Sequence, residues 1–287
     1  MGSNTKFKIG LLHSTIREDE KLIIREAKKK DIPLSVIDVR YQVFNPDKWD
    51  NNIDVILDRC LSTSVGFQAT LFFERIGIPV VNSSRVVQNC DNKFLTSLLL
   101  HEHKIPTVPF ALVFTESQAK EAVKELGGYP IVIKPVSGSW GRLLAKVNDD
   151  DALEGIIEQK QVLGSPIQKV FYIQRYVKKP GRDIRVVVID NIAICAIYRE
   201  TSHWITNTAR GAEAKNCTIN TKISDICSKT SKAIGGGILG VDIFETDAGL
   251  LVNEVNHTME YKNVQRVTGV NIAAEILKFC QGVSKYG

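Results

Sequence analysis

Short apolar runs that alternate with helical stretches constrain the fold of the first ninety residues more than any other feature. The runs KIGLLH, SVIDV, DVILDRC and IPVVN are apolar almost throughout instead of at every second position. Such runs are typical of strands in a parallel sheet that helices cover on both faces. Between the first two, REDEKLIIREAKKK carries Leu22, Ile23 and Ala27 on one stripe, with acids early and bases late, as an amphipathic helix does. We therefore expect a small parallel α/β domain over residues 1–90.

The pattern then changes to an α+β arrangement over residues 91–177. DNKFLTSLLLHEHK predicts a helix, TVPFALVF a strand, and SQAKEAVKELGG a helix that ends at its glycines. The strands PIVIKPV and RLLAKVN flank the loop SGSWG, and a helix over 149–163 leads to the strand KVFYIQRYV. We expect a compact lobe with an antiparallel sheet.

Residues 178–287 are rich in strands. DIRVVVID and IAICAIYRE meet at Asp190-Asn191, a favourable tight turn, and VDIFET and LLVNEVN form a second hairpin. Helices are expected over 222–234 and 270–284. The run GGGILG has the spacing G-x-G-x-x-G of dinucleotide sites, but it follows a helix and precedes a strand, so a helix C-cap explains it better.

The composition excludes several classes of protein. With 44% hydrophobic and 24% charged residues, the chain is neither disordered nor collagen-like, and no apolar run approaches the roughly 18 residues of a membrane span. The six cysteines contain no Cys-x-x-Cys, which disfavours a zinc ribbon, and the N-terminus lacks the apolar stretch of a signal peptide. The net charge of +5 is too modest for a nucleic-acid binder but suits an anionic partner. We expect a cytoplasmic protein that binds neither nucleic acid nor membranes.

The loop from Ser137 to Gly141 is a candidate phosphate site. Its small residues expose backbone N–H groups, which can surround a phosphate. Lys134 ends the preceding apolar strand, so its ammonium group is a candidate for the same phosphates. The alternative is an ordinary hairpin loop beside a lysine that reaches into solvent.

Asp242, Glu254 and Asn256 form a second candidate site. Glu254 and Asn256 are two residues apart in one strand and share a face, with Asp242 expected opposite them on the paired strand. Two carboxylates and an amide oxygen are hard ligands that suit Mg²⁺. The alternative is an acidic face exposed to solvent.

Basic and amide side chains gather in or beside the same C-terminal strands. Arginine forks are the preferred partners of phosphate and carboxylate groups, so the group as a whole favours an anionic substrate, although a surface salt bridge could explain any single member. The members are Arg182, Arg185, Arg199, Asn207 and Arg210.

An ordered set of motifs resembles the RimK-type ATP-grasp ligases over essentially the whole chain. The set comprises DNKFLT, IVIKP, GSWGRLL, QRYV, GRDIRV, HWITNTARG and DIFE…NEVN. The resemblance implies a three-lobed ATP-grasp fold: a pre-ATP-grasp domain over 1–90, a central lobe over 91–177 and a C-terminal lobe over 178–287, with ATP between the last two.

The resemblance also implies a role for each site residue. The implied ATP contacts are Lys93 and Lys134 on the phosphates, the loop Ser137, Gly138, Ser139, Trp140 and Gly141 over them, Gln174, Tyr176 and Val177 on adenine, Asp183 near the ribose and Arg185 at the phosphate end. The implied ligands of two Mg²⁺ ions are Asp242, Glu254 and Asn256. The implied substrate residues are Arg199, Asn207, His257, Thr258 and Glu260, with Arg185 and Arg199 as the catalytic pair.

The implied reaction joins a carboxylate to an amine through an acyl phosphate. The segment 253–263 is most similar to the branch of the family that attaches α-aminoadipate to the acidic carrier protein LysW in lysine biosynthesis. The glutamate–LysW ligases of arginine biosynthesis share nearly every ATP-site feature, so glutamate or dual specificity stays open, as does a RimK-like ligase with another acceptor. A non-catalytic nucleotide-binding module is the non-enzymatic alternative. The family further implies a dimer or tetramer.

Overall fold

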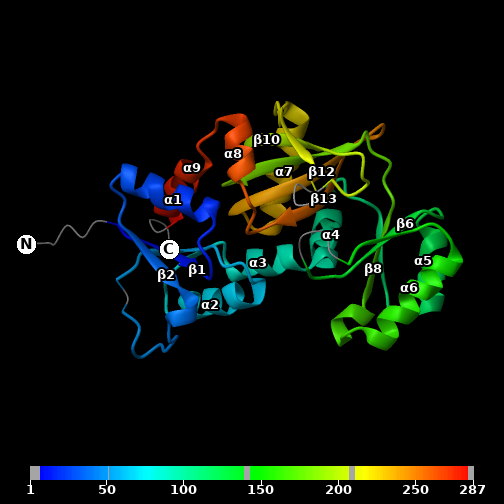
Figure 1. Cartoon of the computed structure of the whole chain (residues 1–287), viewed down its shortest axis with the longest axis horizontal. Coiled ribbons are helices and arrows are strands. Elements are labelled where there is room, and N and C mark those ends of the chain that lie inside the picture. The colour runs from blue at the N-terminus through cyan, green and yellow to red at the C-terminus, as the bar shows by residue number, and fades with distance from the viewer. Residues whose placement is uncertain (1–6, 51, 139–142, 207–210, 284–287) are drawn as a thin grey trace, which may run out of the picture.

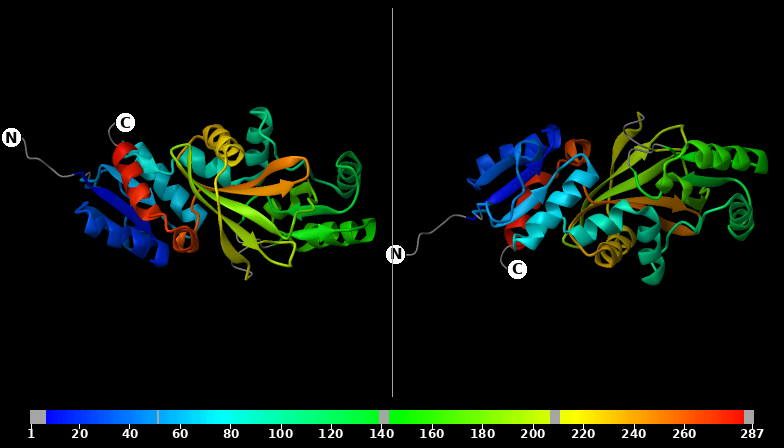
Figure 2. Two further views of the ribbon diagram at one scale, coloured as in Figure 1. Left: turned by 90° about the horizontal axis from the view of Figure 1, so that it is seen from above. Right: turned by 90° about the horizontal axis from the view of Figure 1, so that it is seen from below.

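The computed structural model describes residues 7–50, 52–138, 143–206 and 211–283. Three β-sheets, each with its own helices, follow one another along the long axis of the molecule (Figure 1). In both views of Figure 2 the C-terminal sheet lies between the N-terminal domain at one end and the central lobe at the other. This arrangement confirms the predicted three-lobed fold with one small parallel sheet.

The N-terminal domain contains the parallel sheet, in the order β2-β1-β3-β4. Helix α1 packs on one face together with the C-terminal helix α9, and α2 packs on the other. Ile9 and Leu11 face α1 and α9, and Leu12 faces α2, which is why β1 has apolar side chains on both of its faces. The elements are β1 (Ile9–His13), α1 (Glu18–Lys29), β2 (Leu34–Asp38), η1 (Val39–Tyr41), β3 (Val55–Asp58), α2 (Thr63–Arg75), β4 (Val80–Val81) and α9 (Ile272–Val283).

The central lobe is an antiparallel sheet in the order β5-β8-β6-β7 with two helices on one face. Ile131 and Ile133 of β6 are buried against these helices, while Val132 and Lys134 alternate with them and face the C-terminal sheet. The elements are β5 (Phe110–Val113), α5 (Glu116–Glu125), β6 (Ile131–Lys134), β7 (Ala145–Val147), α6 (Asp150–Leu163), η2 (Pro166–Lys169) and β8 (Phe171–Arg175).

The C-terminal sheet is antiparallel, in the order β11-β10-β9-β12-β13. Helices α3, α4 and α7 bury one of its faces, and α8 and α9 bury the other. Val187 and Ile189 of β9 belong to the same hydrophobic cluster as Ile9 of β1, so the first and third lobes share a core. The elements are α3 (Ser84–Asp91), α4 (Lys93–Glu102), β9 (Arg182–Ile189), β10 (Ile192–Glu200), β11 (Glu213–Cys217), α7 (Thr221–Ile234), β12 (Ile238–Thr246), β13 (Gly249–Asn256) and α8 (Lys262–Thr268).

Two predicted loops are confirmed by their backbone angles. Asp190 and Asn191 have φ values of 50° and 64°, the left-handed pair that a two-residue hairpin turn requires. Gly235 ends α7 with φ 115°, and β12 begins at Ile238, so the glycine run is a helix cap.

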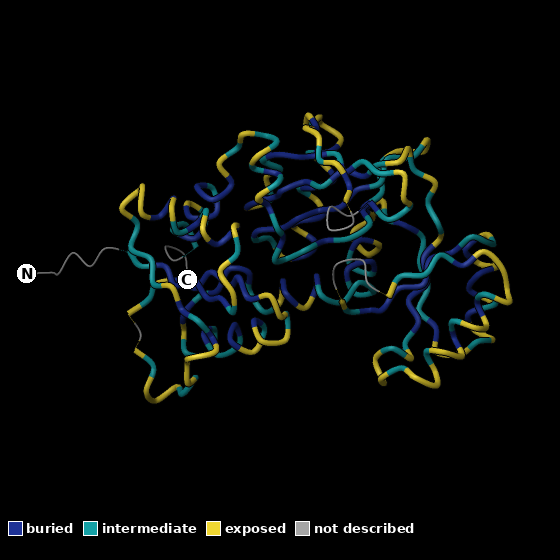
Figure 3. The backbone as a smooth tube through the Cα atoms, in the orientation of Figure 1, coloured by how far each residue is buried: buried dark blue, intermediate teal, exposed yellow. Residues whose placement is uncertain are grey.

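Burial follows the three sheets (Figure 3). The strands are mostly dark blue in the tube view, and exposed segments gather at the loops and helix ends. All six cysteines are free and buried. Within the described ranges, no helix combines the length and the apolar character needed to cross a bilayer.

Candidate active site

A pocket lies between the central and C-terminal sheets, and we call it the inter-sheet pocket. Its walls come from β6 and β8 on one side and from β9, β10, β12 and β13 on the other. Most of the residues predicted for ATP and magnesium line it: Lys93, Lys134, Gly138, Gln174, Tyr176, Val177, Asp183, Arg185, Asp242, Glu254 and Asn256, together with Arg199.

A second pocket, the junction pocket, lies where the N-terminal domain meets the C-terminal sheet. The N-terminal domain contributes Arg17, Cys60, Leu61 and Thr63 to its lining, helix α3 contributes Cys90 and Asp91, and residues 254–260 come from the end of β13 and the segment that follows it. His257, Thr258 and Glu260, predicted for the substrate, line this pocket and not the inter-sheet pocket. The two pockets have six lining residues in common: Lys93, Gly138, Arg185, Arg199, Glu254 and Asn256.

Some predicted residues are not brought to either pocket by the described structure. Ser137 lines a separate pocket beside α3 and α4. Ser139, Trp140, Gly141 and Asn207 lie outside the described residues.

The oxygen side chains of the late hairpin lie as predicted. Asp242 pairs directly with Glu254 in the register of β12 and β13, and Asn256 follows two residues later. A register shift next to Asp242 leaves Asn253 without a partner residue in β12. Asn253 thus adds another polar side chain next to Glu254. Asp242 is only 4% exposed, so the alternative of a fully solvated acidic face is wrong.

Two arginines neutralise Asp242. Arg185 donates to both of its oxygens, and Arg199 Nη2 lies 3.1 Å from Oδ2. Arg199 also forks onto Asp183, with both N···O distances at 2.7 Å. Burial raises the pKa of Asp242, but the two arginines outweigh burial and hold that pKa below its ordinary value.

The sequence did not single out three further polar residues of this cluster. The side chain of Lys179 is 8% exposed, lies beside Asp183 and donates to Thr206, which in turn donates to Asp183. Asn253 accepts a hydrogen bond from Lys134. Since both Asp183 oxygens accept hydrogen bonds from Arg199, the contact of Asp183 with a ribose stays a prediction.

Both predicted phosphate lysines face the inter-sheet pocket. Lys93 Nζ donates to the carbonyl of Gly138 and lies 3.4 Å from Glu254 Oε1. Lys134 is 7% exposed, and its Nζ lies 3.0 Å from Asn253 Oδ1, so the alternative of a solvent-reaching lysine is wrong. Burial lowers the pKa of Lys134 to about 8, and the charge of Lys93 adds to this, while Glu254 opposes it.

We expect ADP affinity to fall as the pH rises above 8. Lys134 is protonated below its folded-state pKa and neutral above it, so a phosphate bound beside it would lose a cationic partner as the pH rises. The dissociation constant, measured by calorimetry from pH 6.5 to 9.5, should rise by up to about 10-fold per pH unit above 8. Lys134→Gln is the control. This variant should bind ADP more weakly at every pH, and its affinity should not depend on pH in this way. If the variant kept the pH dependence of the wild-type protein, the titrating group would be a residue other than Lys134.

Aromatic side chains and a buried amide form the end of the inter-sheet pocket nearest β8. Gln174 is 2% exposed and donates to the Tyr172 hydroxyl at 2.7 Å. Tyr176 contacts Trp204 edge-on, with ring centroids 6.3 Å apart. Flat apolar rings with backbone polar groups beside them suit a nucleobase.

The segment that carries His257 and Thr258 is fixed by Asn82. The Asn82 amide donates to the carbonyls of Ile238 and His257 at 2.8 and 2.7 Å, and its oxygen accepts from Ile238 N at 2.7 Å. Gly237 has φ 92° and leaves no room for a Cβ beside the Asn82 oxygen. Burial lowers the pKa of His257 to about 4, so this side chain is neutral at pH 7, and its Nδ1 is 2.8 Å from Thr258 Oγ1.

Known proteins match this chain over nearly its whole length. A RimK-like ATP-grasp domain matches residues 90–280, and a LysX preATP-grasp domain matches residues 9–89. The α-aminoadipate–LysW ligase LysX of Saccharolobus solfataricus is 38% identical over 91% of this chain and 96% of its own. The glutamate–LysW ligase ArgX of Sulfolobus acidocaldarius is 28% identical over 95% and 97%.

The fold comparison agrees with the sequence comparison. The crystal structure of a RimK-domain ATP-grasp protein from Sphaerobacter thermophilus superposes with a TM-score of 0.80 at 22% identity, covering 95% of this chain and 99% of that one. The fold and the pocket between the two antiparallel sheets agree with the family model and with the sequence relatives. The chain belongs to the RimK-like family of ATP-grasp ligases.

Proposed function

We propose that this protein joins the amino group of α-aminoadipate to the C-terminal glutamate side chain of the carrier protein LysW, using ATP. The observation that carries the proposal is the wall of six residues shared by the inter-sheet and junction pockets. A ligase must hold a nucleotide and two further substrates so that they meet at one point, and this wall is where they would meet.

The proposed reaction needs positioning and charge neutralisation more than a protein nucleophile. A carboxylate oxygen of LysW attacks the γ-phosphorus of ATP, the bond to the β-phosphate oxygen breaks, and ADP leaves. The amine then attacks the acyl carbon, phosphate leaves, and the amine loses a proton as the amide forms. Lys93, Lys134 and Arg185 offer positive charge along the path of the transferred phosphoryl group, as this chemistry demands.

The donor set suits magnesium. Asp242, Glu254 and Asn256 present two carboxylates and an amide oxygen from paired strands; all three line the inter-sheet pocket, and Glu254 and Asn256 also line the junction pocket. These residues would hold the Mg²⁺ ions, of which we propose two. Magnesium supplies neutralisation of the phosphate oxygens. Arg185 and Arg199, which bind the same Asp242 carboxylate, would keep it ionised and oriented.

The other predicted contacts are part of the proposal. Tyr176, Val177 and Gln174 would hold the adenine, and the loop from Ser137 to Gly141 would cover the phosphates. His257, Thr258 and Glu260 would form part of the amino-acid site in the junction pocket. The net charge of +5 would favour the encounter with an acidic carrier. The domain boundaries and a dimeric or tetrameric state stay predictions.

Glutamate is the second candidate amino acid. The three relatives named as α-aminoadipate–LysW ligases are 35–38% identical to this chain, against 27–28% for the two named as glutamate–LysW ligases, which favours α-aminoadipate. Both amino acids have an ammonium group and two carboxylates, and they differ by one methylene. Such a difference gives only about 10- to 200-fold discrimination in a hydrophobic pocket.

Competition on the carrier tests the proposal. LysW is incubated with ATP, magnesium and equal concentrations of α-aminoadipate and glutamate, and the product is read by intact mass. We expect one aminoadipate adduct per carrier, ADP in equal amount, and about 10-fold or greater preference over glutamate. A glutamate adduct alone would favour the second candidate, and ATP binding without ADP formation would reject a ligase.

A further inference from the structure

The junction pocket has one positively charged residue that the inter-sheet pocket lacks. Among the described residues that line the junction pocket, the lysine and arginine side chains are Arg17, Lys93, Arg185 and Arg199. The last three also line the inter-sheet pocket, where ATP phosphates are proposed to bind, whereas Arg17 does not. Arg17 therefore places a positive charge at the end of the junction pocket that lies away from the phosphoryl group.

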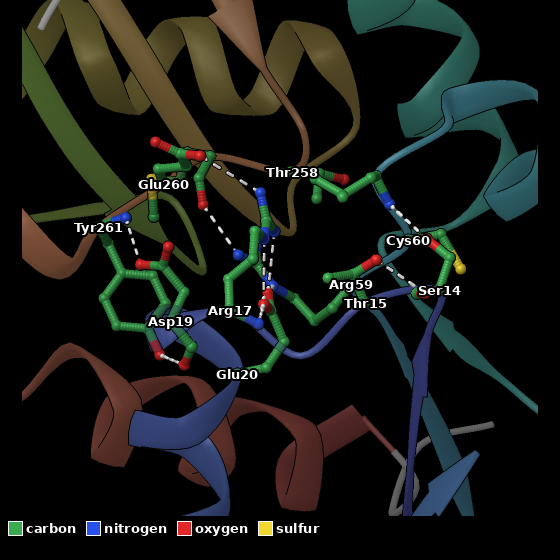
Figure 4. A network of polar contacts seen from close by, with 12 residues as sticks. Ser14, Thr15, Arg17, Asp19, Glu20, Arg59, Cys60, Thr258, Glu260 and Tyr261 are labelled. Atoms are coloured by element: carbon green, nitrogen blue, oxygen red, sulfur yellow. Dashed lines mark hydrogen bonds and ion pairs between the residues drawn. The ribbon is translucent and has the colours of Figure 1, made fainter. Parts of the chain in front are cut away.

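The Arg17 side chain is held in position by buried charges. Glu20 accepts from Arg17 Nε at 3.0 Å and Nη2 at 2.9 Å, and its own carboxylate is fully buried (Figure 4). Arg59, 3% exposed, donates to the same Glu20 carboxylate at 3.0 Å and to the Met259 carbonyl at 3.1 Å. This network links the start of α1 to the segment opposite it across the pocket.

One guanidinium nitrogen of Arg17 is directed at an acid that can move away. Arg17 Nη1 lies 3.3 Å from Glu260 Oε1, and Figure 4 shows Arg17 between Glu20 and Glu260. The Glu260 side chain is 35% exposed, whereas Glu20 is fully buried. Of the two carboxylates on Arg17, Glu260 is thus the one that a competing carboxylate can displace at low cost.

The rest of the pocket suits the carbon chain of a dicarboxylic amino acid. Cys60, Leu61, Val255 and Met259 are among the residues that line it, beside the polar residues of the segment 256–260. The amine that attacks the acyl phosphate must lie at the shared wall, so the side-chain carboxylate of the amino acid extends toward the N-terminal domain. There it needs a cation, since a partly buried carboxylate without a partner is costly.

We infer that Arg17 binds the side-chain carboxylate of the amino-acid substrate and that Glu260 occupies this position until the substrate displaces it. The inference rests on the proposed function, and it assigns substrate recognition to a residue of the N-terminal domain. Arg17, held rigidly by Glu20, is pre-organised for this contact.

Two amines that differ only at the distal group test the inference. α-Aminoadipate and 2-aminohexanoate have the same carbon chain, with a methyl group replacing the carboxylate in the second. For Arg17→Gln, kcat/KM for α-aminoadipate should fall by about 10- to 100-fold, mainly through KM, because a charge-assisted hydrogen bond to the side-chain carboxylate is lost. For the same variant, kcat/KM for 2-aminohexanoate and the KM for ATP should each change by less than about 3-fold.

Further variants separate binding from a structural role. Arg17→Lys keeps the charge but not the planar guanidinium group, and it replaces the glutamine variant if that variant does not fold. Its kcat/KM for α-aminoadipate should fall less than that of Arg17→Gln, and the fall should again be absent for 2-aminohexanoate. Glu260→Gln should lower the KM for α-aminoadipate, and a raised KM would overturn the displacement. Equal loss with both amines, or no loss, would overturn the role of Arg17. Failure of the wild-type protein to modify LysW with either dicarboxylic amino acid would instead reject the proposed function, and the inference with it.

Discussion

Glu254→Gln is expected to lower ligation turnover by about 1,000-fold while the protein stays folded. The substitution keeps the shape of the side chain but removes the negative charge that faces Asp242 across the hairpin and Lys93 at 3.4 Å. Lys93 keeps the carbonyl of Gly138 as a partner when the charge of Glu254 is removed, so the fold should survive the substitution. ADP release with LysW and α-aminoadipate measures turnover, and thermal unfolding measures the fold.

Glu245→Gln is the matched control for this prediction. Glu245 lies on the same hairpin, in β12, but it pairs with Arg182 and lines neither pocket. Its turnover should stay within about 3-fold of wild type. Retained activity in Glu254→Gln would remove the basis for a magnesium site on this hairpin and would favour a non-catalytic nucleotide-binding module.

Arg199→Met is expected to destabilise the protein by about 3–5 kcal/mol at pH 7 and to reduce turnover as well. Methionine fills much of the same volume but leaves two buried carboxylates with fewer partners. Asp183 would retain the Thr206 hydroxyl and Lys179 at 4.0 Å, and Asp242 would retain only Arg185. Urea denaturation measures the loss. Arg182→Met, which removes a more exposed arginine from the neighbouring strand, should cost less than about 1 kcal/mol.

The cost of Arg199→Met should depend on pH in a defined direction. Because the folded-state pKa of Asp242 lies below its ordinary value, its pairing contributes stability above a pH of about 4, and this contribution is lost as the pH falls through the folded pKa. The difference between wild type and variant should therefore be largest near neutral pH and should narrow in acid. A difference that stays constant down to pH 3 would mean that lost packing, not lost pairing, explains the effect.

The sequence predicted the hairpin that carries Asp242, Glu254 and Asn256 well because strand geometry is local. Residues two apart share a face, so the spacing of Glu254 and Asn256 determines their common direction. The opposite strand could also be placed, since only a short turn separates the two. What could not be predicted is the register shift beside Asp242, which brings Asn253 to Lys134. No residue in LLVNEVN signals that irregularity.

The parts of the fold that were not predicted lack a local signal. β11 has the sequence EAKNC, with one buried side chain, and becomes a strand only because the edge of β10 is available to it. Helix α8 has seven residues, and Asp19 of the N-terminal domain accepts hydrogen bonds from the backbone N–H groups of Tyr261 and Lys262 at its start. Arg17 was missed for the same reason, because its partners Glu260 and, through Arg59, Met259 lie more than 200 residues away.

Helix α9 has a consequence for how the chain is made. It covers one face of the N-terminal sheet, yet it is the last helix described, over Ile272–Val283. A ribosome that synthesises about 5–20 residues per second leaves Ile9, Leu11 and Val55 covered by α1 alone for many seconds before α9 exists. A nascent chain halted before residue 272 should therefore expose an apolar sheet face that chaperones bind. A fragment ending at residue 90 should aggregate under conditions in which the full-length protein does not.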